Sequence, residues 1–208
     1  MPSLEDPDLI GGRYRVVSPL GSGNMGDVHL AVHAVTGQKV ALKILRAHVA
    51  QGHGGLKRFL REVQAAATID HPGVVTVFDA GEHNDTLYIA MELLQGDGMG
   101  DKLKASWPRA NAVAAMRSLL EPLAVAHERG IIHRDLKPDN VFIADGPDGA
   151  EVVKLLDFGI AADQTNLGAT QTGLTIGTPY YMSPEQAMDP RTCTGAADVW
   201  SFGVMLYE

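Results

Sequence analysis

The sequence has a single cysteine, Cys193, among its 208 residues. One cysteine excludes an internal disulfide and any cysteine-based zinc cluster, so we interpret it as a buried or idle thiol. Basic residues are also in short supply: 17 Lys and Arg stand against 25 Asp and Glu, which gives a formal net charge of -8. The chain therefore has no diffuse positive field to hold nucleic acid or an anionic membrane, and any phosphate-binding site must be local.

Long hydrophobic runs are missing too. The first ten residues, MPSLEDPDLI, are acidic, and no later apolar stretch approaches the length of a membrane span. These residues thus include no membrane segment, and we expect a reducing, cytoplasmic setting, although an anchor downstream in a longer chain would leave no trace in them. Hydrophobic residues still make up 45% of the chain, enough to bury a core in one domain or two lobes.

Period-two alternation, typical of β-strands, dominates the first part of the chain. It follows YRVVSPLGSG from Tyr14, then DVHLAV and KVALKIL, and returns in GVVTVFDAG and TLYIAMELL. Between Leu56 and Ile69 the apolar residues fall instead at helical spacing, with charged residues between them. We therefore predict a sheet of five strands with one amphipathic helix against it.

The later part of the chain is predicted to be mainly helical. A helix over Asn111–Arg129 would stop at Gly130 and be kinked at Pro122, whose ring displaces the hydrogen bond to the carbonyl of Ser118. The segment Ala162–Thr175 is rich in Gly and Thr and poor in apolar residues, so it is predicted to be a mobile loop. The apolar face of the helix would carry Val113, Met116, Leu120 and Leu123.

The stretch GSGNMGDV, Gly21 to Val28, is the first chemical signal. Glycines let a backbone turn tightly and bring its N–H groups close to phosphate oxygens. The G-x-G-x-x-G spacing also occurs in Rossmann turns, but those open a helix, whereas here a period-two strand follows. A hairpin that covers phosphates fits better, with an ordinary Gly-rich turn as the alternative.

Lys43 is the second signal, because it lies in the apolar strand VALKIL, where an unpaired ammonium group is costly to bury. Glu62, on the following helix, is the natural partner. A lysine held in this way could reach phosphates bound under the hairpin. The alternative is an edge-strand lysine that points to solvent.

The stretch HRDLKPDN, His133 to Asn140, places charged and polar residues directly after an apolar run. A phosphoryl-transfer site needs a carboxylate to orient a hydroxyl, a cation near the moving phosphate and oxygen ligands for Mg²⁺. Asp135, Lys137 and Asn140 supply all three. Asp157, in the later DFG, offers the hard carboxylate that Mg²⁺ prefers.

Taken in order, these motifs resemble those of the eukaryotic-like (Hanks-type) serine/threonine protein kinases, and most of all their bacterial members. The resemblance covers nearly the whole chain, and Lys137 two positions after Asp135 is typical of serine/threonine kinases. The matching motifs are GSGNMGDV, VALK with Lys43, Glu62, HRD at 133–135, Asn140, DFG at 157–159 and SPE at 183–185.

The resemblance implies an α+β fold of two lobes with ATP between them. Residues 1–13 would be a leader, residues 14–94 an N-lobe with a five-stranded antiparallel sheet and one main helix, and residues 95–208 a mostly helical C-lobe. This C-lobe would be incomplete, because the family has further helices after DVWSFGVMLYE. The acid Glu185 and the apolar Val204, Met205 and Leu206 would then lose partners and leave a patch prone to association.

The resemblance also implies catalytic roles. Lys43, paired with Glu62, would hold the α- and β-phosphates of ATP. Asp135 would accept the proton of the substrate hydroxyl, and Lys137 would stabilise charge on the transferring phosphoryl group. Asn140 would assist them as a ligand of Mg²⁺.

The implied cofactors are ATP and Mg²⁺, with Asn140 and Asp157 as the metal ligands. The adenine pocket would have Met91 as its gatekeeper. The residues implied to contact ATP are Leu20, Gly21, Ser22, Gly23, Asn24, Met25, Gly26, Val28, Ala41, Lys43, Met91, Phe142 and, through their backbones, Glu92 and Leu94.

Arg134, beside Asp135, implies control by phosphorylation of the loop after Asp157. Thr178 would line the substrate site, and Ser183, which replaces the usual Ala of the family, is expected to be harmless. The candidate phosphorylation sites, which could also be ordinary polar loop residues, are Thr170, Thr172 and Thr175.

The expected partners are proteins with Ser or Thr acceptors, together with a kinase–kinase dimer as a candidate assembly for trans-autophosphorylation. A second hypothesis is a catalytically inactive ATP-binding or scaffolding fragment, because part of the C-lobe is absent. A kinase of small molecules shares the chemistry of Asp135, Asn140 and Asp157 but usually lacks the full Gly-rich loop and the GTPYYMSPE segment.

Overall fold

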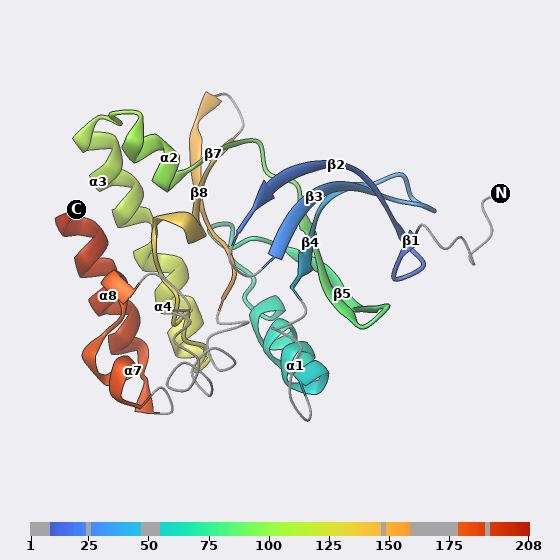
Figure 1. Ribbon diagram of the computed structural model, residues 1–208. Coiled ribbons are helices and arrows are strands. Elements are labelled where there is room, and N and C mark those ends of the chain that lie inside the picture. Colours follow the sequence, from blue (N-terminus) through green and yellow to red (C-terminus); the bar gives the residue numbers. More distant parts are fainter. Residues whose placement is uncertain (1–8, 24–25, 47–54, 147–148, 159–178, 190–191) are drawn as a thin grey trace. The chain divides into compact units, whose positions relative to one another are not determined.

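The computed structural model describes residues 9–23, 26–46, 55–146, 149–158, 179–189 and 192–208 (Figure 1). The chain forms two compact units. Met1–Ala67 with Thr76–Leu94 makes up the first unit, and Thr68–Val75 with Gln95–Glu208 makes up the second.

The segment Thr68–Val75 belongs to the second unit, whereas the sequence-based boundary kept it in the N-lobe. Its backbone bonds explain the difference. Leu155 N donates to Gly73 O at 2.8 Å, and Val75 N donates to Leu155 O at 2.9 Å. Because buried backbone groups rarely go unpaired, these bonds hold the segment with the second unit.

A six-stranded antiparallel sheet forms most of the first unit (Figure 1). All five predicted strands are present, but the count was one too low, because two residues of the predicted leader form a further strand. Gly11 and Gly12, with φ of 59° and 67°, turn the chain there. In the order β1-β2-β3-β4-β6-β5, the strands are β1 Leu9–Ile10, β2 Tyr14–Ser22, β3 Gly26–His33, β4 Lys39–Leu45, β6 Thr86–Glu92 and β5 Val77–His83.

Side-chain alternation gives this sheet two different faces. In the register of the sheet, Lys43 lies opposite Val28 and Ile89, and Ala41 lies opposite Met91. The residues of β3, β4 and β6 predicted to contact ATP through their side chains therefore share one face. The other face carries the buried cluster Tyr14, Ala31, Val40, Leu42, Tyr88 and Ala90.

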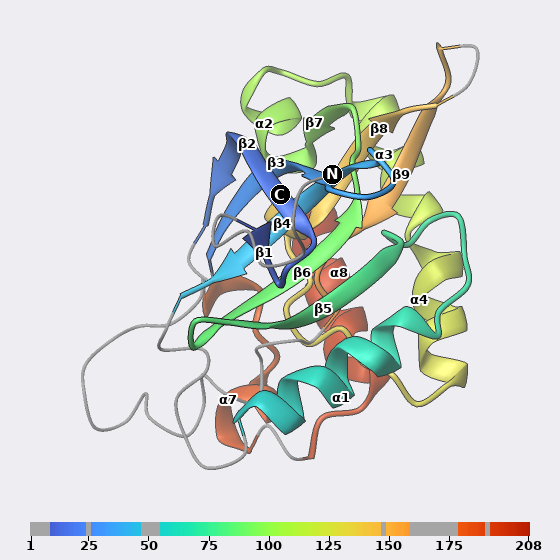
Figure 2. The ribbon, with the colours of Figure 1, turned by 90° about the vertical axis from the view of Figure 1, so that its right-hand side faces the viewer.

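The predicted amphipathic helix is α1, Gly55–Ala67, which packs beside β5 (Figure 2). Phe59 is fully buried and Val63 is nearly so. These two residues lie four positions apart, on one side of a helix with 3.6 residues per turn. The helical period predicted from the sequence is thus confirmed.

The second unit is mainly helical, with a small antiparallel sheet of β7 Gly96–Gly98, β8 Val141–Asp145 and β9 Glu151–Leu155. None of the described helices is both long and apolar enough to cross a membrane. The helices are α2 Met99–Lys104, α3 Arg109–Ser118, α4 Leu120–Glu128, α7 Pro184–Met188, α8 Gly195–Tyr207 and the 3-10 helices η2 Pro138–Asn140 and η4 Pro179–Tyr181.

The single helix predicted over Asn111–Arg129 is in fact two helices, α3 and α4, that meet at Leu119. Pro122 explains the break, because it stands in the first turn of α4, where its missing N–H is tolerated. The predicted stop at Gly130 is confirmed by its φ of 72°, in the left-handed region.

The break also corrects the predicted apolar face. Met116 and Leu123 are buried as predicted, but Val113 and Leu120 are each 50% exposed. Four residues can line up along one helix only while its period is unbroken. The interruption at Leu119 ends that period, and in each of the two helices the first residue of the pair, Val113 in α3 and Leu120 in α4, faces solvent.

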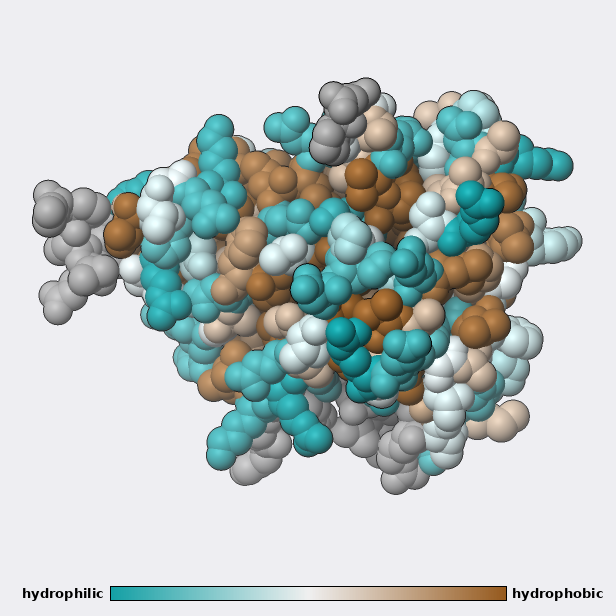
Figure 3. All heavy atoms as spheres, turned by 180° about the vertical axis from the view of Figure 1, so that it is seen from behind, coloured by the Kyte–Doolittle hydropathy of each residue, from teal (hydrophilic) through white to brown (hydrophobic). Residues whose placement is uncertain are grey.

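Burial of single residues near the end of the chain matches the predictions in part. Cys193 is buried, as predicted. Met205 is 6% exposed and has partners, whereas Leu206 is 52% exposed. Both lie beside a hollow of about 440 Å³ lined by α2, α3 and the end of α8. On the face of the molecule seen in Figure 3, hydrophobic residues are interspersed with hydrophilic ones.

Gly26, the first residue of β3, lies too close to β4 for any side chain. A Cβ at this position would lie 2.1 Å from the carbonyl oxygen of Ile44, a backbone atom that cannot rotate away. Gly21 lies in the same hairpin, and a Cβ there would meet nothing within 4 Å. The two glycines form a matched pair for testing how closely β3 and β4 approach.

We predict that Gly26→Ala lowers the free energy of unfolding by about 1–3 kcal/mol, the usual cost of overpacking. Gly21→Ala should change it by less than about 0.5 kcal/mol, as is usual for surface substitutions. Urea denaturation of both variants, followed by circular dichroism, measures the difference. Equal stabilities would mean that β3 can move away from β4 without cost.

Candidate active site

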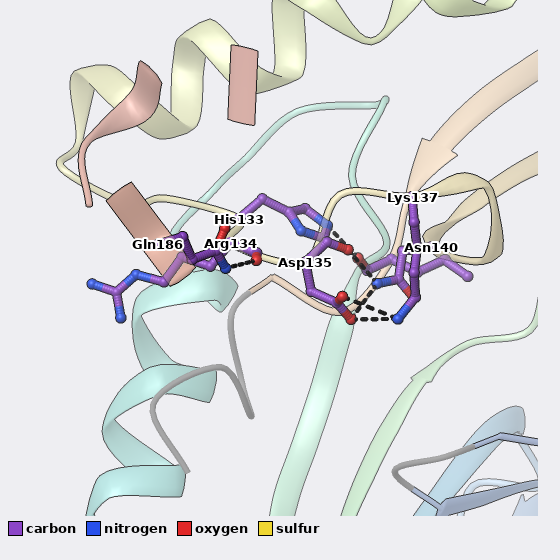
Figure 4. A network of polar contacts seen from close by, with 7 residues as sticks. His133, Arg134, Asp135, Lys137, Asn140 and Gln186 are labelled. Atoms are coloured by element: carbon purple, nitrogen blue, oxygen red, sulfur yellow. Dashed lines mark hydrogen bonds and ion pairs between the residues drawn. The ribbon is translucent and has the colours of Figure 1, made fainter. Parts of the chain in front are cut away.

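The loop between α4 and β8 brings Asp135, Lys137 and Asn140 together (Figure 4). Lys137 Nζ lies 3.0 and 2.8 Å from the two carboxylate oxygens of Asp135, and Asn140 Nδ2 donates to Asp135 Oδ2 at 3.0 Å. Lys137 and Asn140 are buried, whereas the Asp135 side chain is 25% exposed. Asp135 is thus a carboxylate fixed by two donors and still open to solvent.

Asn140 also fixes the backbone of the loop. Its Nδ2 donates to Asp135 O at 2.6 Å, in addition to the bond to the Asp135 carboxylate. Both hydrogens of the amide group therefore point at Asp135. The amide oxygen, Oδ1, is left as the accepting atom of the Asn140 side chain.

Backbone and histidine contacts connect this loop to the residue before Asp157. Leu156 N donates to Asn140 O at 2.9 Å, and His133 Nε2 lies 2.8 Å from Leu156 O. A carbonyl oxygen can only accept, so Nε2 carries the proton of the His133 ring. The ring packs on Phe158, with 4.8 Å between ring centroids. Asp157 therefore lies between two anchored residues.

The donor set of Asn140 and Asp157 fits the predicted Mg²⁺ ion. Magnesium takes oxygen ligands in octahedral geometry and usually keeps waters and substrate phosphates beside one or two carboxylates. Asn140 Oδ1 and the Asp157 carboxylate are such oxygens, and the Leu156–Asn140 bond connects their backbones. Within the described ranges, no group of three or more His, Cys, Asp or Glu residues could hold a metal ion. Phosphate and water would have to complete the coordination.

Asp198, on α8, holds the start of the loop and was not predicted from the sequence. Its carboxylate is 1% exposed and accepts from His133 N and Arg134 N, each at 2.8 Å, and from His127 Nε2 at 2.7 Å. Gly195, one turn earlier, leaves room for the His127 ring, since a Cβ there would lie 2.7 Å from Nδ1. The signal that could have found Asp198 is an acid inside the apolar helix AADVWSFGV, where burial demands partners.

Helix α7 contributes two further residues whose contacts were missed. Ser183 is fully buried, and its Oγ accepts from Gln186 N at 3.3 Å, so that it caps the helix. An alanine at this position lacks that contact. Gln186 is also buried and donates from Nε2 to the carbonyl oxygen of Arg134 (Figure 4).

The Gly-rich stretch forms the β2–β3 hairpin in the first unit, and a strand follows it, as predicted. Gly23 N donates to Gly26 O at 2.9 Å across the turn. Asn24 and Met25 lie outside the described residues. The remaining predicted contacts in this hairpin, exposed on β2, are Leu20, Gly21 and Ser22.

Lys43 is 7% exposed on β4, which has a neighbouring strand on each side. The alternative of an edge-strand lysine that points to solvent is therefore wrong. Glu62 is half-buried on α1 of the same unit. The ion pair between Lys43 and Glu62 stays a prediction.

The residues predicted to contact adenine are divided between the two units. Ala41 and Met91, each 8% exposed, are register partners in the first unit, where Val28 is half-buried. Phe142, also half-buried, belongs to β8 of the second unit. Their roles stay predictions, as do those of Glu92 and Leu94 at the end of the first unit.

Several predictions fall on residues outside the described ranges. They concern Gly159 of the DFG motif, the mobile loop Ala162–Thr175 and the substrate contact of Thr178. The candidate phosphorylation sites Thr170, Thr172 and Thr175 lie there as well.

Comparison with known proteins shows the family to which the chain belongs. Residues 14–208 match the family model described as the protein kinase domain. The chain belongs to the protein kinase family. The predicted family resemblance and the predicted two-lobed α+β kinase fold are thereby confirmed.

Similar proteins include bacterial enzymes named as serine/threonine-protein kinases. The kinase chain is 41% identical over 207 residues to pkn2 of Myxococcus xanthus, which covers 98% of the chain and 25% of pkn2. It is 36% identical over 201 residues to PrkC of Bacillus subtilis (strain 168), which covers 96% of the chain and 30% of PrkC. The chain thus spans less than a third of these curated relatives.

A similar solved structure is that of the PknI kinase domain of Mycobacterium tuberculosis. The TM-score is 0.76 at 30% sequence identity, over 93% of this kinase chain and 72% of the PknI chain. The fold of the kinase chain is therefore that of a known protein kinase domain.

We predict that Asp198→Asn lowers the free energy of unfolding of the kinase chain by about 3–5 kcal/mol, the usual cost of breaking a buried charged contact. The amide would present hydrogens to an N–H donor and leave that donor unsatisfied. Asp101→Asn is the control, because Asp101 forms an exposed ion pair with Lys104 and should contribute less than about 1 kcal/mol. Chemical denaturation compares the two, and equal losses would contradict the role given to Asp198.

Proposed function

We propose that this chain is a serine/threonine protein kinase, which transfers the γ-phosphoryl group of ATP to Ser or Thr hydroxyls of proteins. The observation that carries the proposal is the convergence of buried Lys137 and Asn140 on the partly exposed carboxylate of Asp135. The names of the relatives, serine/threonine-protein kinases, support the same acceptor class.

The chemistry follows from this geometry. As the substrate oxygen forms its bond to the γ-phosphorus, the bond from that phosphorus to the bridging oxygen of the departing ADP breaks. The hydroxyl proton passes to Asp135. Lys137, whose Nζ lies 2.8 Å from Asp135, places a positive charge where the transferred group gains negative charge. Both side chains are held in advance, which suits a reaction that depends mostly on positioning.

Residues of both units would hold the nucleotide. The N–H groups of the β2–β3 hairpin are suited to phosphate oxygens, and Lys43, on the same sheet face as Ala41 and Met91, would hold the α- and β-phosphates with Glu62 as its partner. Asn140 Oδ1 and the Asp157 carboxylate would hold Mg²⁺. When bound, this ion would offset the negative charge of the phosphates.

The proposal extends to partners and setting. The acceptors are proteins with exposed Ser or Thr, and a second copy of the chain is the partner for autophosphorylation in trans. Such autophosphorylation would regulate the enzyme at Thr170, Thr172 or Thr175. The reaction would take place in the cytoplasm, where ATP is available.

We predict that Asp135→Asn lowers the rate of transfer by about 10²–10⁴-fold, the range expected for loss of a positioned base. Asp139→Asn is the matched control, because Asp139 is an exposed acid in the same loop and should leave the rate unchanged. The measurement is transfer of radiolabel from ATP, with Mg²⁺, to the chain itself and to a generic protein substrate. Nucleotide binding without incorporation in the wild type would sink the proposal and leave an ATP-binding or scaffolding role.

We also predict that Asp157→Asn raises the Mg²⁺ concentration needed for tight nucleotide binding by at least about tenfold, since even loss of an outer metal partner costs about 10- to 100-fold in affinity. Asp145→Asn, at an exposed acid that ends β8, should not change it. Calorimetric titration with a non-hydrolysable ATP analogue over a range of Mg²⁺ concentrations measures both. An unchanged Mg²⁺ requirement would remove Asp157 from the metal site.

A further inference from the structure

Gln186, on α7, reaches the catalytic loop from a distant part of the chain. The residue is 5% exposed, and its Nε2 donates to the carbonyl oxygen of Arg134 (Figure 4). Its own N–H donates to Oγ of Ser183, the N-cap of α7. Gln186 is therefore fixed through both its backbone and its side chain, and none of the roles proposed above accounts for it.

The bond ends on a residue in an unfavourable conformation. Arg134 has a φ of 64°, in the left-handed region that residues with a Cβ rarely adopt. Such a conformation persists only where the surroundings hold it. Here Arg134 N donates to Asp198 Oδ1 at 2.8 Å, and Arg134 O accepts from Gln186. Buried side chains of two helices, α8 and α7, thus hold Arg134 at both ends.

The oxygen that Gln186 binds belongs to the peptide group that leads into Asp135. A peptide group is planar, so fixing its oxygen also fixes the direction of the Asp135 N–H. The next peptide group is held in the same way, because Asn140 Nδ2 donates to Asp135 O at 2.6 Å. Asp135 therefore lies between two peptide planes, each held by a side-chain amide. One amide is local, and the other comes from α7.

The chain just before α7 is itself bonded to α8. Ser201 follows Asp198 by three residues on that helix, and its Oγ donates to Tyr181 O at 2.7 Å. Asp198 and Ser201 are both buried, so one side of α8 holds both the catalytic loop and the approach to α7. Since Gln186 also bonds to Arg134, three segments are each hydrogen-bonded to the other two: the catalytic loop, α8, and α7 with the residues just before it.

We propose that Gln186 is a positioning residue for phosphoryl transfer, which acts through the Arg134 carbonyl to hold Asp135 in its reactive orientation. The inference rests on the proposed function of Asp135. A displacement of α7 releases one of the two peptide planes around Asp135, so the position of α7 sets the rate of transfer. Affinity for ATP is not affected, because the two contacts of Gln186, to Arg134 and Ser183, involve no residue predicted to bind ATP.

Two substitutions at this position test the inference. Gln186→Met keeps the length of the side chain but cannot donate, and Gln186→Glu keeps its shape but directs oxygen at the Arg134 carbonyl. Both should lower kcat by about 10- to 100-fold, the effect of a small misplacement of a reacting group, with KM for ATP changed less than about twofold. Met188→Ala, at an 85% exposed residue of the same helix, should match the wild type.

The measurements are kcat and KM for ATP with a generic protein substrate, with thermal unfolding to confirm that each variant is folded. If Gln186→Met keeps the wild-type kcat, the inference is overturned even if Gln186→Glu is inactive, because repulsion then explains that loss. A KM for ATP that rises as much as kcat falls would indicate a general structural role and would also overturn it.

A wild-type chain that binds nucleotide but transfers nothing would defeat the proposed function separately. Nuclear magnetic resonance then decides whether Gln186 orients Asp135. The amide of Asp135 belongs to the peptide group that Gln186 binds, so Gln186→Met should shift its resonance and Met188→Ala should not. An unshifted Asp135 amide in folded Gln186→Met overturns the inference by this route.

Discussion

The buried carboxylate of Asp198 is the constraint on which the catalytic loop depends. An ion in the protein interior loses its hydration, at a cost of several kcal/mol unless hydrogen bonds replace the water. Here the replacement comes from the His127 ring and from the backbone N–H groups of His133 and Arg134. Those N–H groups need an acceptor as much as the carboxylate needs donors. The loop and helix α8 therefore supply each other's hydrogen-bond partners, and the start of the loop is held in a fixed position.

From that fixed point, hydrogen bonds outweigh local backbone preference. Arg134 and Asp157 both have positive φ, 64° and 54°, and each stands next to or within the candidate site. Neither conformation is favoured by its own residue type, although an aspartate accepts it more readily than an arginine. Each is held by neighbours: Arg134 by Asp198 and Gln186, and Asp157 by bonds on both sides of Leu156. Such arrangements concentrate at functional sites because the surrounding structure determines them.

Local sequence patterns predicted most of the fold, whereas residues whose partners are distant in the sequence were missed. Alternation found β2 to β6, helical spacing found α1, and the strand after the Gly-rich stretch distinguished a hairpin from a Rossmann turn. The motif residues Asp135, Lys137 and Asn140 were found because they lie within six positions of one another. Asp198 and Gln186 were missed because their partners lie 64 and 52 positions away, and no local period reports such contacts. Proline sterics predicted a kink at Pro122, but not that the helix would divide into α3 and α4 at Leu119.

The segment Thr68–Val75 has a consequence for how such domains can recombine. The chain passes from one compact unit to the other after Ala67, after Val75 and after Leu94, so neither unit is one continuous stretch. A genetic crossover at the Leu94–Gln95 boundary would carry Gly73 and Val75 along with the foreign first unit. Strand β9 would then pair, through Leu155, with a segment of different ancestry. Although each unit is compact, neither is encoded by one continuous segment of the gene.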